Sequence, residues 1–158
     1  AAGDRARANP FFSQALQAQQ AGRMFTAVEA YKKAAELDPA FFEAQYNLGL
    51  AAYALKDYKQ ALSAFERALS INPTAPDTRY SFALALHKSN YARDAADELE
   101  KVLASNPNDG RAHFTLANIY AQQLQEPGRA RAHYQRLLEL EPTHPQATAI
   151  RDWLVRHP

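Results

Sequence analysis

The sequence has no cysteine, few glycines and no long apolar run, and each absence removes a class of protein. With no cysteine among its 158 residues, the chain has no disulfide, no thiolate metal ligand and no thiol nucleophile. Its five glycines stand far apart, so there is no glycine-rich loop to cradle a phosphate. No apolar stretch approaches the roughly 20 residues that a membrane-spanning helix needs.

The sequence also lacks an excess of charge of either sign. Its 18 Lys and Arg residues nearly balance 17 Asp and Glu residues, which leaves a net charge of +1. Such a balance offers no general attraction for nucleic acid or anionic lipid, so we expect a partner that recognises a local surface. The composition looks bacterial but does not choose between cytoplasm and periplasm. Because the chain starts at Ala1 without methionine, we expect a mature form or a fragment of a longer protein.

Internal repetition is the strongest signal that is present. An Asp/Asn-Pro or Glu-Pro pair follows an apolar stretch at Pro39, Pro73, Pro107 and Pro142, with spacings of 34, 34 and 35 residues. The residues twelve, eight and five positions before these prolines match in each unit and share one helix face. In chain order they are Ala27, Ala61, Ala95 and Ala130; Tyr31, Phe65, Leu99 and Tyr134; and Ala34, Ala68, Val102 and Leu137.

A second helix is expected before each of these, because a bulky-then-small pair recurs at Leu48-Gly49, Phe82-Ala83 and Leu116-Ala117. Small residues at these sites and at the matching alanines let two antiparallel helices approach closely. The first helices are expected at 9–21, 42–54, 76–88 and 110–122, and the second helices at 24–37, 58–71, 92–105 and 128–140. A last helix at about 145–156 is expected to cap the array.

The second unit resembles the tetratricopeptide repeat (TPR) consensus. It reads Tyr46-Asn47-Leu48-Gly49, Asp57-Tyr58, Ala61, Phe65, Ala68-Leu69 and Asn72-Pro73. The resemblance implies an all-α, right-handed superhelical solenoid of antiparallel helix pairs. We expect a disordered segment at 1–7, four units within 8–142 (8–41, 42–75, 76–109 and 110–143) and a capping helix within 144–158.

One departure from the consensus recurs near the start of the units. The usual large aromatic residue is Phe11 in the first unit, but the later units have Gln45, Arg79 and His113. We expect these changes to alter local curvature without affecting the fold.

The resemblance further implies a concave groove, lined by the first helices, that binds an extended peptide. Carrying the consensus groove positions onto this chain places aromatic, leucine and polar side chains in it. The expected groove residues are Phe12, Tyr46, Asn47, Leu50, Tyr53, Tyr80, Leu84, His87, Phe114 and Asn118. Part of each Tyr46 and Tyr80 ring could instead pack against the adjacent unit. Leu50 and Leu84 are harder to explain by packing, because a leucine that faces a groove leaves apolar surface in water.

Some relatives grip the carboxylates of a chaperone tail with Lys, Asn and Arg side chains, and that ligand is disfavoured here. Of the residues in that clamp only Asn47 is present, because the other positions hold Phe12, Leu16, Asp77 and Ser81. Asn47 could still hydrogen-bond the backbone of a ligand.

No catalytic, cofactor or metal motif is apparent, and we expect a protein that is not an enzyme. His113 and His133 can approach one another in the fourth unit, but neither has an evident carboxylate partner, and we interpret them as solvated side chains. The acidic stretch of Asp94, Asp97, Glu98 and Glu100 is likewise interpreted as a solvated helix face.

The sequence therefore predicts a non-catalytic scaffold that binds an apolar or amphipathic segment of another protein in its groove. One alternative is a homo-oligomer, in which the terminal helix with Trp153 enters a neighbour's groove. Another is a regulatory TPR segment of a larger enzyme or of a secretion or assembly protein.

Overall fold

The computed structural model describes residues 3–158 (of Pro76, only the backbone), and this part of the chain contains nine α-helices and no strand. The helices are α1 (Arg5–Gln20), α2 (Met24–Leu37), α3 (Phe42–Ala54), α4 (Tyr58–Ile71), α5 (Pro76–Lys88), α6 (Ala92–Ser105), α7 (Gly110–Gln122), α8 (Pro127–Leu140) and α9 (Ala147–Arg156). The all-α prediction is confirmed, and most of the predicted helix ends agree with these bounds.

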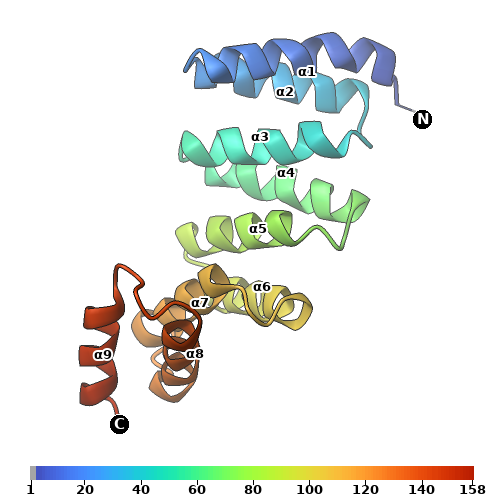
Figure 1. Ribbon diagram of the computed structural model, residues 1–158. Helices are drawn as coiled ribbons and strands as arrows, with labels where there is room; N and C mark the ends of the chain where they lie inside the picture. The colour runs from blue at the N-terminus through green and yellow to red at the C-terminus, as the bar shows by residue number, and fades with distance from the viewer. Residues whose placement is uncertain (1–2) are drawn as a thin grey trace. The chain divides into compact units, whose positions relative to one another are not determined.

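The chain divides into two compact units at Ser89 and Asn90. The first unit holds α1 to α5, and the second holds α6 to α9. The boundary separates α5 from α6, which are the two helices of the predicted third repeat. In the first unit each helix packs against the next, with α1, α3 and α5 in one layer and α2 and α4 in the layer behind (Figure 1). In the second unit α7 packs against α6 and α8, and α9 packs against α8.

Small side chains allow the helices of a pair to approach closely, as the repeat pattern predicts. The repeated alanines of the second helices, Ala27, Ala61, Ala95 and Ala130, have no exposed surface. Gly49 shows the tightest fit, because a Cβ atom at this position would lie 2.4 Å from Cε1 of the buried Phe65 ring. Any larger residue at position 49 would force one helix away from the other.

The turns between repeats also repeat their hydrogen bonds. The side-chain oxygens of Asp38, Asn72 and Asn106 each accept from the backbone N–H two residues later, at 3.2–3.3 Å. These Asx turns end the second helix of each pair, and the proline that follows prevents its continuation. The Asp/Asn-Pro pairs in the sequence are therefore the ends of helix pairs, as predicted.

The predicted disorder of residues 1–7 is wrong for the described part of that segment. Residues 1–2 lie outside the described residues, but α1 begins at Arg5, four residues before the predicted start. Asp4 caps the helix by accepting from the N–H of Arg7 at 3.0 Å. The guanidinium of Arg5 pairs with Asp38 at 2.6 Å and lies 3.8 Å from the centre of the Phe41 ring. These contacts hold the first turn of α1 against the start of the second repeat.

Candidate functional site

A row of leucines lies along the first helices of the first unit. Leu16 on α1, Leu50 on α3 and Leu84 on α5 are separated by 34 residues each. Leu16 is 38% exposed, Leu50 is 37% exposed and Leu84 is half-buried. We refer to the layer of α1, α3 and α5 that carries this row as the leucine face. Repeated apolar side chains that remain partly in water on one face are typical of interaction surfaces.

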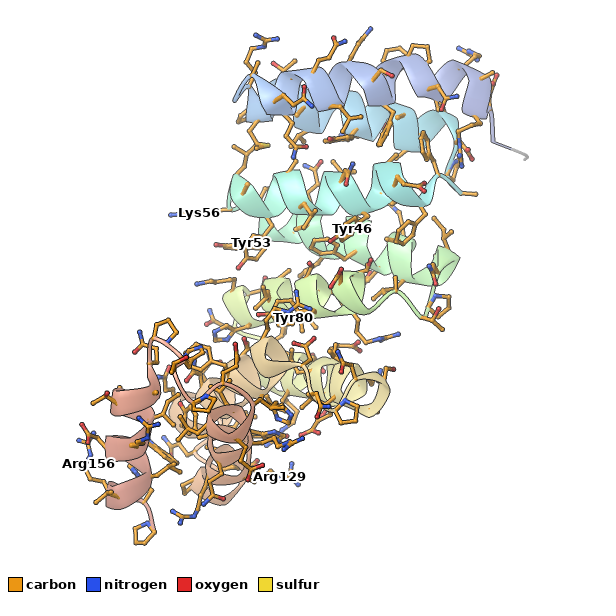
Figure 2. All side chains as sticks on the ribbon, in the orientation of Figure 1. Tyr46, Tyr53, Lys56, Tyr80, Arg129 and Arg156 are labelled. Atoms are coloured by element: carbon orange, nitrogen blue, oxygen red, sulfur yellow. The ribbon has the colours of Figure 1, made fainter. Side chains whose placement is uncertain are left out.

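Tyrosines gather on the same face where α3 and α5 meet. Figure 2 shows Tyr46, Tyr53 and Tyr80 on the side of α3 and α5 that faces the viewer. The Tyr53 ring meets Tyr58 edge-on, with centroids 5.4 Å apart. Burial raises the pKa of Tyr53, and the neighbouring Tyr58 and Tyr80 phenols raise it further. Tyr53 therefore stays an uncharged hydrogen-bonding group beside the leucine row. His87, which occupies in the third repeat the position that Tyr53 occupies in the second, is half-buried.

Two of the predicted groove aromatics contribute mainly to packing. The Phe12 ring lies 4.9 Å from Phe41 and 5.7 Å from Tyr31, centroid to centroid. The Tyr46 ring stacks on Phe42 at 6.0 Å and contacts Phe65 at 6.2 Å. Both rings are half-buried, so each joins neighbouring helices and leaves only part of its surface for a ligand.

Asn47 also has an internal role. Its side chain hydrogen-bonds the Tyr31 hydroxyl, which itself donates to Oε1 of Gln19 at 2.6 Å. Burial raises the pKa of Tyr31, and the bond from Asn47 opposes that increase. This polar cluster connects α1, α2 and α3 behind the leucine row. Because an amide has several hydrogen-bonding positions, Asn47 keeps capacity for a ligand while it holds Tyr31.

Phe114 and Asn118, the remaining predicted groove residues, belong to the second unit and contact its own elements. The Phe114 ring lies 4.8 Å from His144, and the Tyr134 hydroxyl donates to Oδ1 of Asn118. Together with α9 they line a cavity of about 270 Å³. The sequence did not reveal this cavity, because the part that α9 plays in it depends on how the capping helix packs.

Larger hollows in the first unit involve α2 and α4 and differ chemically from the leucine face. A cavity of about 510 Å³ has Lys32, Glu36 and Arg67 in its lining, so both charge signs are present. The buried side-chain oxygen of Gln45, which also lines it, has no hydrogen-bond partner among the described residues. We prefer the leucine face as the candidate site, because its partly exposed leucines repeat with the period of the chain, whereas charged side chains of both signs line this cavity.

The histidines of the fourth repeat form a buried network, and their interpretation as solvated side chains is wrong. His113 is only 7% exposed, and its Nδ1 lies 3.0 Å from Nδ1 of His133. His133 in turn lies 3.4 Å from Glu100. The Tyr120 hydroxyl donates to Glu100 at 3.0 Å, so this member of the acidic stretch is not simply solvated.

The contact between His113 and Pro107 indicates which ring nitrogen of His113 carries a proton. Nε2 of His113 lies 2.7 Å from the carbonyl oxygen of Pro107, so this nitrogen carries a proton. With that proton on Nε2, Nδ1 of His113 can accept from an N–H of His133. Burial lowers the pKa of His133 despite the opposing pull of Glu100, and the neighbouring His113 and Arg129 lower it further. The network joins α6, α7 and α8.

No group of three or more His, Cys, Asp or Glu side chains within residues 3–158 is arranged to hold a metal ion. Among the described helices, none combines the length and the apolar character needed to cross a membrane.

Repeated antiparallel helix pairs with a 34-residue period, as in α1/α2, α3/α4 and α7/α8, define the TPR class of helical solenoid. The family model described as the cytochrome c-type biogenesis protein H TPR domain matches residues 43–147, about two thirds of the chain. A general TPR repeat model matches residues 20–56. The chain belongs to the TPR family.

Solved structures of TPR proteins support the same fold. The chain resembles MamA 41-end from Desulfovibrio magneticus RS-1 with a TM-score of 0.83 and 25% identity, covering 99% of this chain and 87% of that one. Another MamA crystal structure gives a TM-score of 0.85 at 19% identity, covering 95% and 87%. YrrB, described as a TPR protein with an unusual peptide-binding site, gives 0.74 at 23% identity, covering 93% and 84%. No curated protein matches the chain significantly.

Proposed function

We propose that the protein is a non-catalytic scaffold whose leucine face binds an apolar or amphipathic segment of another protein. The observation that supports this most directly is the partial exposure of Leu16 and Leu50 in the same register, on a face that also carries Tyr53 and Tyr80. Burial of apolar side chains by a partner supplies the favourable free energy, and rigid aromatic rings provide anchors. Membership of the TPR family agrees with this proposal, since TPR domains generally mediate interactions between proteins.

The name of the matching family directs the search for a partner. That family is described as a domain of a cytochrome c-type biogenesis protein, so we take proteins of that process as the first candidates. It also favours the alternative in which this chain is a TPR segment of a larger assembly protein. In that case the leucine face binds a segment of the assembled protein, and any catalytic step belongs to another component.

The proposal is tested by placing charge on the leucine face. In the double variant Leu50→Glu/Leu84→Glu, two carboxylates would have to be buried with the partner, and desolvating them costs far more than the leucines contribute. We expect partner capture from the source lysate to fall by at least about tenfold, with far-UV circular dichroism unchanged.

A matched control carries the same charge change on helices that are not part of the leucine face. Phe25 on α2 and Val155 on α9 are 74% and 80% exposed, so Phe25→Glu/Val155→Glu also replaces two exposed apolar residues. This control should capture the partner as the wild type does. Equal capture by wild type and both double variants would reject the leucine face as the binding site.

A further inference from the structure

The cavity beside α9 has the form of a receptor for one side chain. It is lined by Phe114, Asn118 and Gln122 of α7, Tyr134 of α8, and Gln146, Ala149, Ile150 and Trp153 at or within α9. Its volume is about 270 Å³, below the roughly 300–1,000 Å³ of sites that hold drug-sized ligands. A single bulky side chain is therefore a better match in size than a cofactor.

The chemistry of the lining restricts the occupant further. Three aromatic rings and Ile150 offer apolar surface, and no lining residue carries a charge. A carboxylate or ammonium group would lose its hydration there without gaining an ionic partner. The amides of Asn118, Gln122 and Gln146 instead match the N–H and C=O groups of a peptide backbone.

The walls of the cavity are held in place before any ligand arrives. The Trp153 ring meets Tyr134 edge-on at 5.0 Å and stacks on His157 at 4.1 Å, centroid to centroid. Arg131 of α8 donates to the carbonyl oxygens of Leu154 and His157, and Arg151 donates to that of Pro142. These hydrogen bonds tie the C-terminal end of α9 to α8 and the middle of α9 to the turn that precedes it. A pocket whose walls are already held avoids the entropic cost of ordering them on binding.

We propose that this cavity accepts a single uncharged, bulky side chain, leucine-like or phenylalanine-like, from a partner peptide. The proposal rests on the proposed peptide-binding function and adds that the partner peptide must contain one such side chain for this cavity. Phe114 and Asn118 occupy in the fourth repeat the register that Tyr46 and Leu50 occupy in the second. The repeat positions expected to contact a peptide thus acquire in this unit a pocket that α9 completes.

Trp153 makes the proposal directly measurable, because it is the only tryptophan in the chain and lines the cavity. The probes are capped tripeptides: acetyl-Gly-Phe-Gly-amide, acetyl-Gly-Leu-Gly-amide and, for comparison, the Ala and Asp versions. We expect the Phe and Leu peptides to shift the Trp153 emission and its indole N–H resonance saturably, with dissociation constants on the order of 1–10 mM. The Ala and Asp peptides should give at least about fivefold weaker responses.

Two neighbouring positions on α9 provide a matched pair of variants. Ala149 lines the cavity and Thr148 does not, and both are exposed, so a phenylalanine at either site leaves the buried core of the unit unchanged. Ala149→Phe should weaken binding of the Leu peptide at least tenfold, and Thr148→Phe should not. Phe114→Ala, which removes a wall instead of filling the space, should also weaken it.

Three results would overturn the proposal: no response of Trp153 to any peptide, the same response to all four, or responses that Ala149→Phe leaves unchanged. The Leu50→Glu/Leu84→Glu variant should bind these tripeptides as the wild type does. The experiments therefore distinguish failure of the pocket proposal from failure of the proposal that the leucine face binds a partner.

Discussion

At the scale of single residues, every helix pair turns at one residue with a positive φ angle. These residues are Gly22 (φ 75°), Lys56 (61°), Asn90 (65°) and Gln125 (53°). Glycine adopts this region freely and asparagine tolerates it, but a lysine or glutamine places its Cβ too close to the backbone. The first and third turns thus hold residues suited to their conformation, and the second and fourth do not.

Lys56→Gly should therefore stabilise the first unit. Relief of the left-handed conformation raises the free energy of unfolding by about 1–2 kcal/mol. The greater freedom of glycine in the unfolded chain lowers it by about 0.5–1 kcal/mol. We expect a net gain of about 0.5–1 kcal/mol, measured by urea unfolding followed by circular dichroism. Glu66→Gly, at an exposed site in the middle of α4, should lose about 0.5–1 kcal/mol and serves as the control. If both variants were destabilised alike, the strain at position 56 would be excluded.

Single residues also mark one limit of what the sequence could predict. Gln45, Arg79 and His113 stand where the consensus has an aromatic residue, and the sequence indicated only that they depart from it. In the structure all three hydrogen-bond the carbonyl oxygen of the proline six residues earlier, at 3.5, 2.9 and 2.7 Å. The shared role depends on where the turn places that carbonyl, which a residue pattern does not encode.

At the scale of helices, the histidine network predicts that the stability of the second unit depends on pH. His133 on α8 is surrounded by His113 and Tyr120 of α7, Glu100 of α6 and Arg129 of its own helix. Its pKa is lowered in the folded state, so the unfolded chain takes up a proton at a higher pH than the folded chain does. Stability is therefore complete above the ordinary histidine pKa of about 6.5 and falls as the pH drops toward the lowered value.

We accordingly expect the thermal midpoint of the second unit to decrease between pH 7 and pH 5. Trp153 fluorescence follows this unit, because the only tryptophan of the chain lies in α9. His133→Gln removes the titrating group and should flatten the profile over this range. His87→Gln, a change in α5 of the first unit, should not. A midpoint that does not change from pH 7 to pH 5 in the wild type would contradict this assignment.

Helix boundaries were largely predictable because proline and the repeat period mark them. For α3, α5 and α7 the predicted first and last residues agree with the structure. The start of α1 was missed, because its stability depends on the Asp4 cap and on the long-range pairing of Arg5 with Asp38. Such a pairing spans a full repeat and becomes visible only once the helices are packed.

At the scale of the whole molecule, repeat register predicted which side chains lie on the first helices but not what they do there. Leu50 is partly exposed as expected, whereas much of the surface of Phe12 and Tyr46 is buried against neighbouring aromatic rings. The division at Ser89 and Asn90 cuts the predicted third repeat between its helices. A strict 34-residue pattern treats all repeats as equivalent, so it contains no information about where compact units end.

Self-association through the terminal helix is limited by the small apolar surface that α9 leaves exposed. Self-association through the terminal helix would require Trp153 to leave its contacts with Tyr134 and His157, and Ile150 is already buried. Val155 is the one large apolar side chain of α9 that is mostly exposed, at 80%, which is too little surface for a stable dimer. We expect analytical ultracentrifugation to give the monomer mass of 17.6 kDa across a hundredfold dilution. A mass that doubles with concentration and returns to the monomer value in Val155→Glu would instead identify α9 as a contact between copies. Peptide binding to the cavity beside α9 would then have to be measured at concentrations where the chain is monomeric.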